Sequence, residues 1–208
     1  MTNLVPTAGS KGRSLRGKLL GSLIVLGLVG AIAGVGTWSA FTATTSNPNN
    51  QFAAGTVAIG DNDSNGAIFS MAGMKPGSTS SGCIQVTYTG SLASNVKLYG
   101  TTTGSGLDPY INVTVTRGTI SSGAFSSCTN FTADATNYIG AGGGVVYSGT
   151  LQGYADDWTG GLLDAPSATE SWTTNEVHAY KFDVTLQDTD SAQGKTATQV
   201  FTWEARNT

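Results

Sequence analysis

The sequence predicts an all-β protein, an antiparallel β-sandwich that follows an N-terminal export signal. Two observations lead to this prediction. Apolar and polar residues alternate with a period of two along several segments of the 208-residue chain, and turn-forming residues separate these segments. The first forty residues instead combine basic residues with one long apolar run. We therefore expect a signal peptide over residues 1–39, a polar N-terminal arm over 40–51 and a β-sandwich domain over 52–208.

The leader has four basic residues between positions 11 and 18 and no Asp or Glu, and twenty uncharged residues follow, Leu19–Trp38. This order is typical of an export signal, because the cations stay on the cytoplasmic side while the apolar run enters the lipid. Small residues at its end predict cleavage between Ser39 and Ala40, or one residue later. A retained membrane anchor is the alternative, since the run is long enough to span a hydrocarbon core of ~30 Å. Five glycines weaken the run as a membrane helix, so cleavage is preferred.

The chain that remains after cleavage has six basic and thirteen acidic residues, a net charge of −7. This charge argues against nucleic acid as a partner, because phosphates require a basic face. It also argues against docking on anionic lipids, so membrane contact is expected only through an uncleaved leader. The expected location is the extracellular matrix or the cell surface.

Five segments have the alternation expected of strands. Their apolar faces consist of Ile84, Val86 and Tyr88; Val96 and Leu98; Ile111, Val113 and Val115; His178, Tyr180, Phe182, Val184 and Leu186; and Ala197, Phe201, Trp203 and Ala205. Strands 176–187 and 196–205 flank a polar turn, which predicts an antiparallel hairpin. Residues 117–144 and 153–175 do not alternate and are expected to be surface excursions.

Cys83 and Cys128 are the two cysteines of the chain. In an oxidising compartment an even pair predicts one disulfide, which would stabilise the fold by roughly 4 kcal/mol through restriction of the unfolded chain. A metal site is the alternative. It is less favoured, because two thiols and the single histidine, His178, do not supply four ligands without carboxylates in register.

The segment Asp61–Gly66 (DNDSNG) places oxygen ligands at positions one, three and five and glycine at position six, as a calcium loop does. The closing Glu of such a loop is missing, because the twelfth position is Ala72. Since strand-like residues flank the segment, a hairpin turn explains the same composition and is preferred.

Catalytic residues are not indicated. The acidic pairs Asp156–Asp157 and Asp188/Asp190 could act as glycosidase carboxylates or metal ligands. Their spacing does not distinguish them from exposed acidic residues in surface turns, which is the preferred interpretation. His178 lies on an apolar strand face, where a satisfied core histidine is the commoner case. No hydrolase or phosphate-binding motif occurs in the sequence. We expect no enzyme activity, no bound metal and no cofactor.

Three short motifs resemble the TasA/camelysin family of bacterial secreted proteins. GVGTWSAF (Gly34–Phe41) is similar to the end of a family leader that a dedicated signal peptidase cuts. FAAGT at residues 52–56 resembles the segment that opens the first family strand, and MKPGS (Met74–Ser78) resembles a Pro-Gly turn before the next strand. The resemblance covers about residues 34–100 of the sequence.

The resemblance implies a jelly-roll-like β-sandwich that polymerises into biofilm-matrix or cell-surface fibres. In such fibres the N-terminal arm pairs as a strand with the next subunit, through backbone hydrogen bonds. The arm residues are Ala40, Phe41, Thr42, Ala43, Thr44 and Thr45, and Pro48 would end the pairing. The implied partners are further copies of the chain, the dedicated signal peptidase and an accessory assembly protein.

Two alternatives from other functional classes remain at this point. One is a secreted metal-dependent hydrolase of the camelysin type that uses His178 with acidic turn residues. Some relatives are labelled metallopeptidases, but the sequence has no zinc motif, so that activity is not carried over. The other is a monomeric surface binding module whose ligand contacts Trp158 and Trp172 in the 153–175 excursion.

Overall fold

The computed structural model describes residues 42–46, 57–163 and 171–207, and of residues 42–46 it describes the backbone alone. All of these residues belong to one compact unit, Ala40–Thr208. The leader and the predicted cleavage residues Ser39 and Ala40 lie outside the described residues. Within the described residues no helix is long and apolar enough to cross a membrane.

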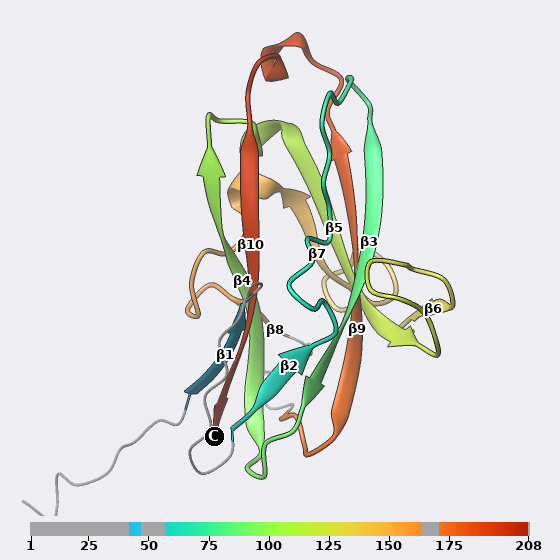
Figure 1. Cartoon of the computed structure of the whole chain (residues 1–208), viewed down its shortest axis with the longest axis vertical. Helices are drawn as coiled ribbons and strands as arrows, with labels where there is room; N and C mark the ends of the chain where they lie inside the picture. Colours follow the sequence, from blue (N-terminus) through green and yellow to red (C-terminus); the bar gives the residue numbers. More distant parts are fainter. Residues whose placement is uncertain (1–41, 47–56, 164–170, 208) are drawn as a thin grey trace, which may run out of the picture. The chain divides into compact units, whose positions relative to one another are not determined.

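Two antiparallel sheets pack face to face in the described part of the chain (Figure 1). The first sheet has the order β1 (Thr42–Ser46), β10 (Ala197–Asn207), β4 (Ser94–Gly104), β8 (Leu162–Leu163). The second has the order β2 (Ile59–Asp61), β3 (Thr79–Tyr88), β9 (Glu176–Leu186), β5 (Ile111–Ile120), β6 (Phe131–Ala133), and β7 (Val145–Thr150) also pairs with β5. Short 3₁₀ turns occur at Asp108–Tyr110, Leu151–Gly153 and Asp190–Ala192. The predicted all-β, jelly-roll-like antiparallel sandwich is confirmed.

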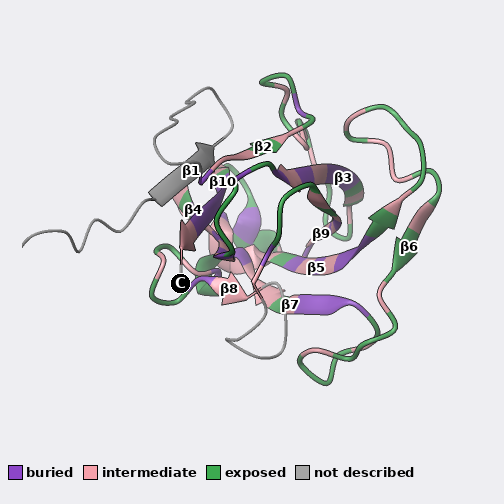
Figure 2. Cartoon of the chain, turned by 90° about the horizontal axis from the view of Figure 1, so that it is seen from below, coloured by how far each residue is buried: buried purple, intermediate pink, exposed green. Residues whose placement is uncertain are grey.

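The five strands predicted from alternation are β3, β4, β5, β9 and β10, and their apolar faces meet in the core. Phe182 of β9 and Trp203 of β10 are 0 % and 1 % exposed. The rings of Phe182 and Phe201 connect the two sheets, with centroids 4.4 Å apart. Figure 2 shows buried residues along the strands and exposed ones mainly in the connections. Burial of these large side chains provides most of the driving force for packing the sheets.

The hairpin predicted between residues 176–187 and 196–205 is wrong. β9 pairs with β3 and β5, whereas β10 pairs with β1 and β4 in the other sheet. The chain crosses from one sheet to the other through the turn at Asp190–Ala192. Alternation identifies a strand with one apolar face, but strands of facing sheets have the same pattern as strands of one hairpin. The connection is long enough to span the ~10 Å between packed sheets.

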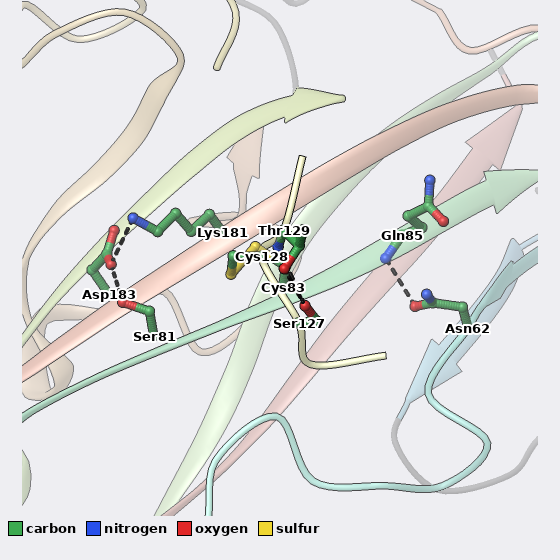
Figure 3. The surroundings of a disulfide bond; sticks show 9 residues. All are labelled: Asn62, Ser81, Cys83, Gln85, Ser127, Cys128, Thr129, Lys181 and Asp183. Carbon is green, nitrogen blue, oxygen red and sulfur yellow. Dashed lines mark hydrogen bonds and ion pairs between the residues drawn. A yellow bond between two sulfur atoms is a disulfide. The ribbon is translucent and has the colours of Figure 1, made fainter. Parts of the chain in front are cut away.

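The Cys83–Cys128 disulfide is present, with the two Cα atoms 5.1 Å apart. It attaches the connection between β5 and β6 to β3 (Figure 3). Next to it, the backbone amides of Cys83 and Ser126 each donate to the other residue's carbonyl, at 3.3 and 3.1 Å. The side-chain amide of Gln85 donates to the carbonyl of Ile120 at 3.2 Å. A disulfide of this kind indicates an oxidising compartment rather than the cytoplasm.

Candidate assembly site

The predicted arm contributes strand β1, which pairs antiparallel with β10 of the same chain. Thr42 lies opposite Arg206 and Ser46 opposite Thr202, so four of the six arm residues, Thr42 to Thr45, are in this ladder. The other two, Ala40 and Phe41, lie outside the described residues. Figure 1 shows β1 beside the C-terminal part of β10. The N-terminal strand is thus an edge strand of the first sheet.

β10 offers a longer edge than β1 covers. On one side β4 pairs with β10 along its whole length, Ala197–Asn207. On the other side β1 pairs only with Thr202–Arg206. Among the described residues, no strand pairs with this second side of Ala197–Phe201. An edge of this kind can accept a further strand through backbone hydrogen bonds.

A groove of about 920 Å³ opens between the two sheets along this part of β10. It is lined by inner residues of both sheets and by the irregular segment 65–76, including Ile68, Phe69, Met71, Met74, Ile84, Ile111, Val113, Val184, Leu186, Phe201 and Trp203. The segment lies close to β3, because a side-chain carbon at Gly82 would come within 2.9 Å of the Ile68 carbonyl oxygen. Glycine at position 82 therefore allows the segment to form one wall of the groove.

The outer face of β10 carries a satisfied charge cluster where β1 pairs. The Glu204 carboxylate is buried, and it accepts hydrogen bonds from the Tyr99 hydroxyl at 2.7 Å and the Arg206 Nε at 2.8 Å. The centroid of the Trp158 ring lies 4.2 Å from Arg206 Cζ and 5.2 Å from Lys97 Nζ, so both cations contact the face of this ring. Burial raises the pKa of Tyr99 to about 12, and the hydrogen bond to Glu204 adds to this. These contacts connect the C-terminal part of β10 to β4 and to the segment before β8.

The Asp61–Gly66 segment does not form the predicted hairpin turn, because β2 pairs with β3 rather than with residues after the loop. The Gly66 amide donates to the Asp63 carbonyl at 2.8 Å, and Ser64 and Asn65 between them have φ of 50° and 68°. Asp63 is only 7 % exposed. Burial raises the pKa of Asp63 to about 6; the Asn65 amide lowers it, and contact with Asp61 raises it further.

His178 lies at the end of the inner face of β9, in a polar cluster. Its Nε2 is 2.9 Å from Glu176 Oε1 and 3.5 Å from a terminal nitrogen of Arg117. The centroids of the His178 and Trp172 rings are 4.4 Å apart. Arg117 is also paired with Asp134 at 3.0 Å. These partners position the imidazole as part of the fold. In the part of the chain that the structure describes, no three Asp, Glu, His or Cys side chains come together, so His178 has no set of side-chain metal ligands around it.

The remaining acidic candidates and the two tryptophans lie in separate places. Asp156 and Asp157 are exposed next to β8, and Asp188 and Asp190 are exposed in the crossover between β9 and β10. Trp172 is fully buried and its backbone pairs with Ser94, whereas Trp158 is half-buried under Arg206. The 153–175 excursion therefore does not present both indole rings to one ligand.

Sequence reasoning missed the part of the β10 edge that no described strand covers, and the groove beside it. Ala197 and Phe201 indicated a strand, but its neighbours depend on sheet order, which alternation does not encode. The irregular segment 65–76 gave one signal, a run of apolar residues (Ile68, Phe69, Met71) without strand alternation. Comparison with known proteins finds no matching family and no matching curated protein.

Proposed function

We propose that this protein is a secreted structural subunit of extracellular fibres in a biofilm matrix or on a cell surface, and that it assembles by strand donation. In this proposal β1 of one copy pairs with β10 of the next copy. The observation on which it rests is the arrangement at β10. A short N-terminal edge strand pairs with Thr202–Arg206, and no other described strand covers the adjacent edge, which lies beside an apolar groove.

The pairing of β1 is weak enough to be exchanged. Five residue pairs join β1 to β10. Each backbone hydrogen bond has a net value of about 0.5–1.5 kcal/mol, so a ladder of this length contributes on the order of 2–7 kcal/mol. Edge strands with such small contributions open locally without unfolding the core. A donated β1 would regain the same bonds on a neighbouring copy, as in domain swapping.

Donation in one direction would produce a fibre rather than a closed pair. If the arm of one copy occupies β10 of a second, the arm of the second copy is released for a third. Such head-to-tail contacts form open filaments when the rotation between copies does not close. Ten residues separate Ser46 from Val57. They span at most about 35 Å when extended, which is sufficient for an arm to reach an adjacent subunit.

The groove gives assembly a further source of free energy. Exposed apolar surface between two sheets is costly in water, and contact with a neighbouring copy would bury it. Val200, on the open part of the edge, is 37 % exposed. The disulfide and the low content of charged side chains suit a protein that works outside the cell.

A pair of engineered cysteines tests strand donation directly. Ala43 and Ala205 are opposite each other in the β1–β10 register. In the double variant Ala43→Cys/Ala205→Cys, oxidation of assembled material is expected to give a ladder of covalent multimers on a denaturing, non-reducing gel. The matched control is Thr103→Cys/Thr198→Cys, which joins β4 to β10. Because those strands stay in one chain, this control should remain a monomer.

Removal of residues 40–48 provides the complementary test. The shortened protein is expected to fold but to form no fibres in electron micrographs, because the donated strand is gone. Fibres formed by this deletion, or assembled Ala43→Cys/Ala205→Cys protein that cross-links only within single chains, would refute the strand-donation proposal.

A further inference from the structure

The loop Asp61–Gly66 connects β2 to the segment 65–76 and holds two carboxylates close together. Oδ1 of Asp61 accepts a hydrogen bond from the Asp63 amide at 3.2 Å. Oδ1 of Asp63 in turn accepts one from the Asn65 amide at 2.7 Å. Both acidic side chains thus accept hydrogen bonds from the backbone of the loop itself.

Among the described residues, no group donates a hydrogen bond to the second carboxylate oxygen of Asp63. Asp63 is 93 % buried, since only 7 % of it is exposed, and its Oδ2 is buried without a hydrogen bond. The Asp61 carboxylate contacts the same side chain. A buried carboxylate oxygen is costly unless something satisfies it, and two carboxylates in contact need a proton or a cation between them. The buried Asp63 oxygen, which lies beside a second carboxylate and accepts no hydrogen bond from the described residues, is therefore a candidate cation ligand.

We infer that this loop binds one Ca²⁺ ion, with the carboxylates of Asp61 and Asp63 as its anionic ligands. The two acids occupy positions one and three of a calcium-loop pattern, with Asn65 at five and Gly66 at six. In the described residues no third acidic side chain joins them, so the other ligands must be main-chain, amide or hydroxyl oxygens of the same loop and water. Ca²⁺ accepts such mixed oxygen shells, whereas Mg²⁺ demands a near-ideal octahedron.

The affinity is expected to be low. Only two carboxylates are present and the closing Glu of a complete loop is replaced by Ala72. Sites with few anionic ligands in extracellular proteins have dissociation constants of roughly 10⁻⁴–10⁻³ M. Ser64 and Asn65 at the tip are exposed, so an ion can enter from solvent. The site would be filled where calcium is millimolar and empty where it is micromolar.

The rest of the loop is already attached to the sandwich. The backbone amide of Gln85 donates to Asn62 Oδ1 at 2.9 Å, which attaches the loop to β3. The Phe125 ring packs against Gly66, since a side-chain carbon there would lie 2.7 Å from it. Binding therefore requires little rearrangement, and a bound ion would fix the connection between β2 and the groove wall.

Thermal unfolding and calorimetry test the inference on protein exported and processed from the full-length chain. With 10 mM CaCl₂ the unfolding temperature is expected to rise by roughly 3–10 °C relative to EDTA, as a millimolar or tighter site predicts. Titration with CaCl₂ should show one site per chain. Asp63→Asn should weaken binding at least tenfold, and it should fold because its amide oxygen still accepts from Asn65. The matched control is Asp156→Asn, which removes one exposed charge elsewhere and should bind like the unmodified protein.

Two results would overturn the site, and a third would contradict its assignment to calcium. One is an unmodified protein with the same unfolding temperature in CaCl₂ and EDTA, which would mean that a proton satisfies the two carboxylates. The other is an equal calcium response in Asp63→Asn, which would place the ion elsewhere on the acidic surface. A response to MgCl₂ as large as to CaCl₂ would also contradict the assignment.

Discussion

Breaking the Cys83–Cys128 disulfide should lower the free energy of unfolding by about 4 kcal/mol. The two cysteines are 45 residues apart in sequence. A cross-link over a loop of that length restricts the unfolded chain by roughly this amount at 25 °C. Since Cys83 is 1 % exposed, its replacement would also remove buried packing. Reduction of the unmodified protein is therefore the cleaner perturbation, because both side chains stay in place.

Urea denaturation followed by tryptophan fluorescence measures the effect, since Trp172 and Trp203 are buried and become exposed on unfolding. With a urea dependence near 2 kcal/mol/M, the midpoint is expected to fall by about 2 M on reduction. The double variant Cys83→Ala/Cys128→Ala should fall at least as far and should not respond to the reductant. A midpoint shift below about 0.5 M in the reduced protein would refute the cross-link argument. A large loss in the alanine variant alone would then assign the effect to packing.

Two further predictions concern the sheets. Gly118→Ala should lower the free energy of unfolding by about 1–3 kcal/mol, because the added carbon would collide with the backbone of Thr132 in β6. Gly60→Ala is the control in the same urea assay, since a carbon added at Gly60 would have no atom within 4 Å. Tyr99 contributes stability below pH 10 that is lost as the pH rises toward 12, because its pKa is raised in the folded state through burial and Glu204. Tyr99→Phe should therefore lose less stability than the unmodified protein between pH 9 and 11; identical pH profiles would contradict this assignment.

Local sequence patterns predicted much of the fold because they reflect local physics. Ile84, Val86 and Tyr88 alternate with polar residues, and they are buried in β3 because successive side chains of a strand point to opposite faces. The cysteine pair predicted its own disulfide, since no other thiol was present to compete. Neither inference needed the identity of the neighbouring strand.

Features that depend on strand neighbours could not be predicted in the same way. The pattern of β9 and β10 fits a hairpin as well as two facing sheets, and only the packed sandwich decides between them. For the same reason the sequence did not show that β1 would pair with half of β10. Asp63 resembled a solvated turn residue, but in the fold it is only 7 % exposed. Its neighbour Asn62 is hydrogen-bonded to Gln85 of β3, which is distant in the sequence.

The sequence by itself determined an all-β chain with a leader-like N-terminus, a single disulfide and an acidic surface, because composition and period-two alternation depend only on neighbouring residues. The tertiary structure decided which strands pair, which part of the β10 edge the described strands leave uncovered, and which buried carboxylate oxygen accepts no hydrogen bond from the described residues. These properties depend on contacts between residues distant in sequence. The proposed assembly edge and the proposed calcium loop both belong to this second group.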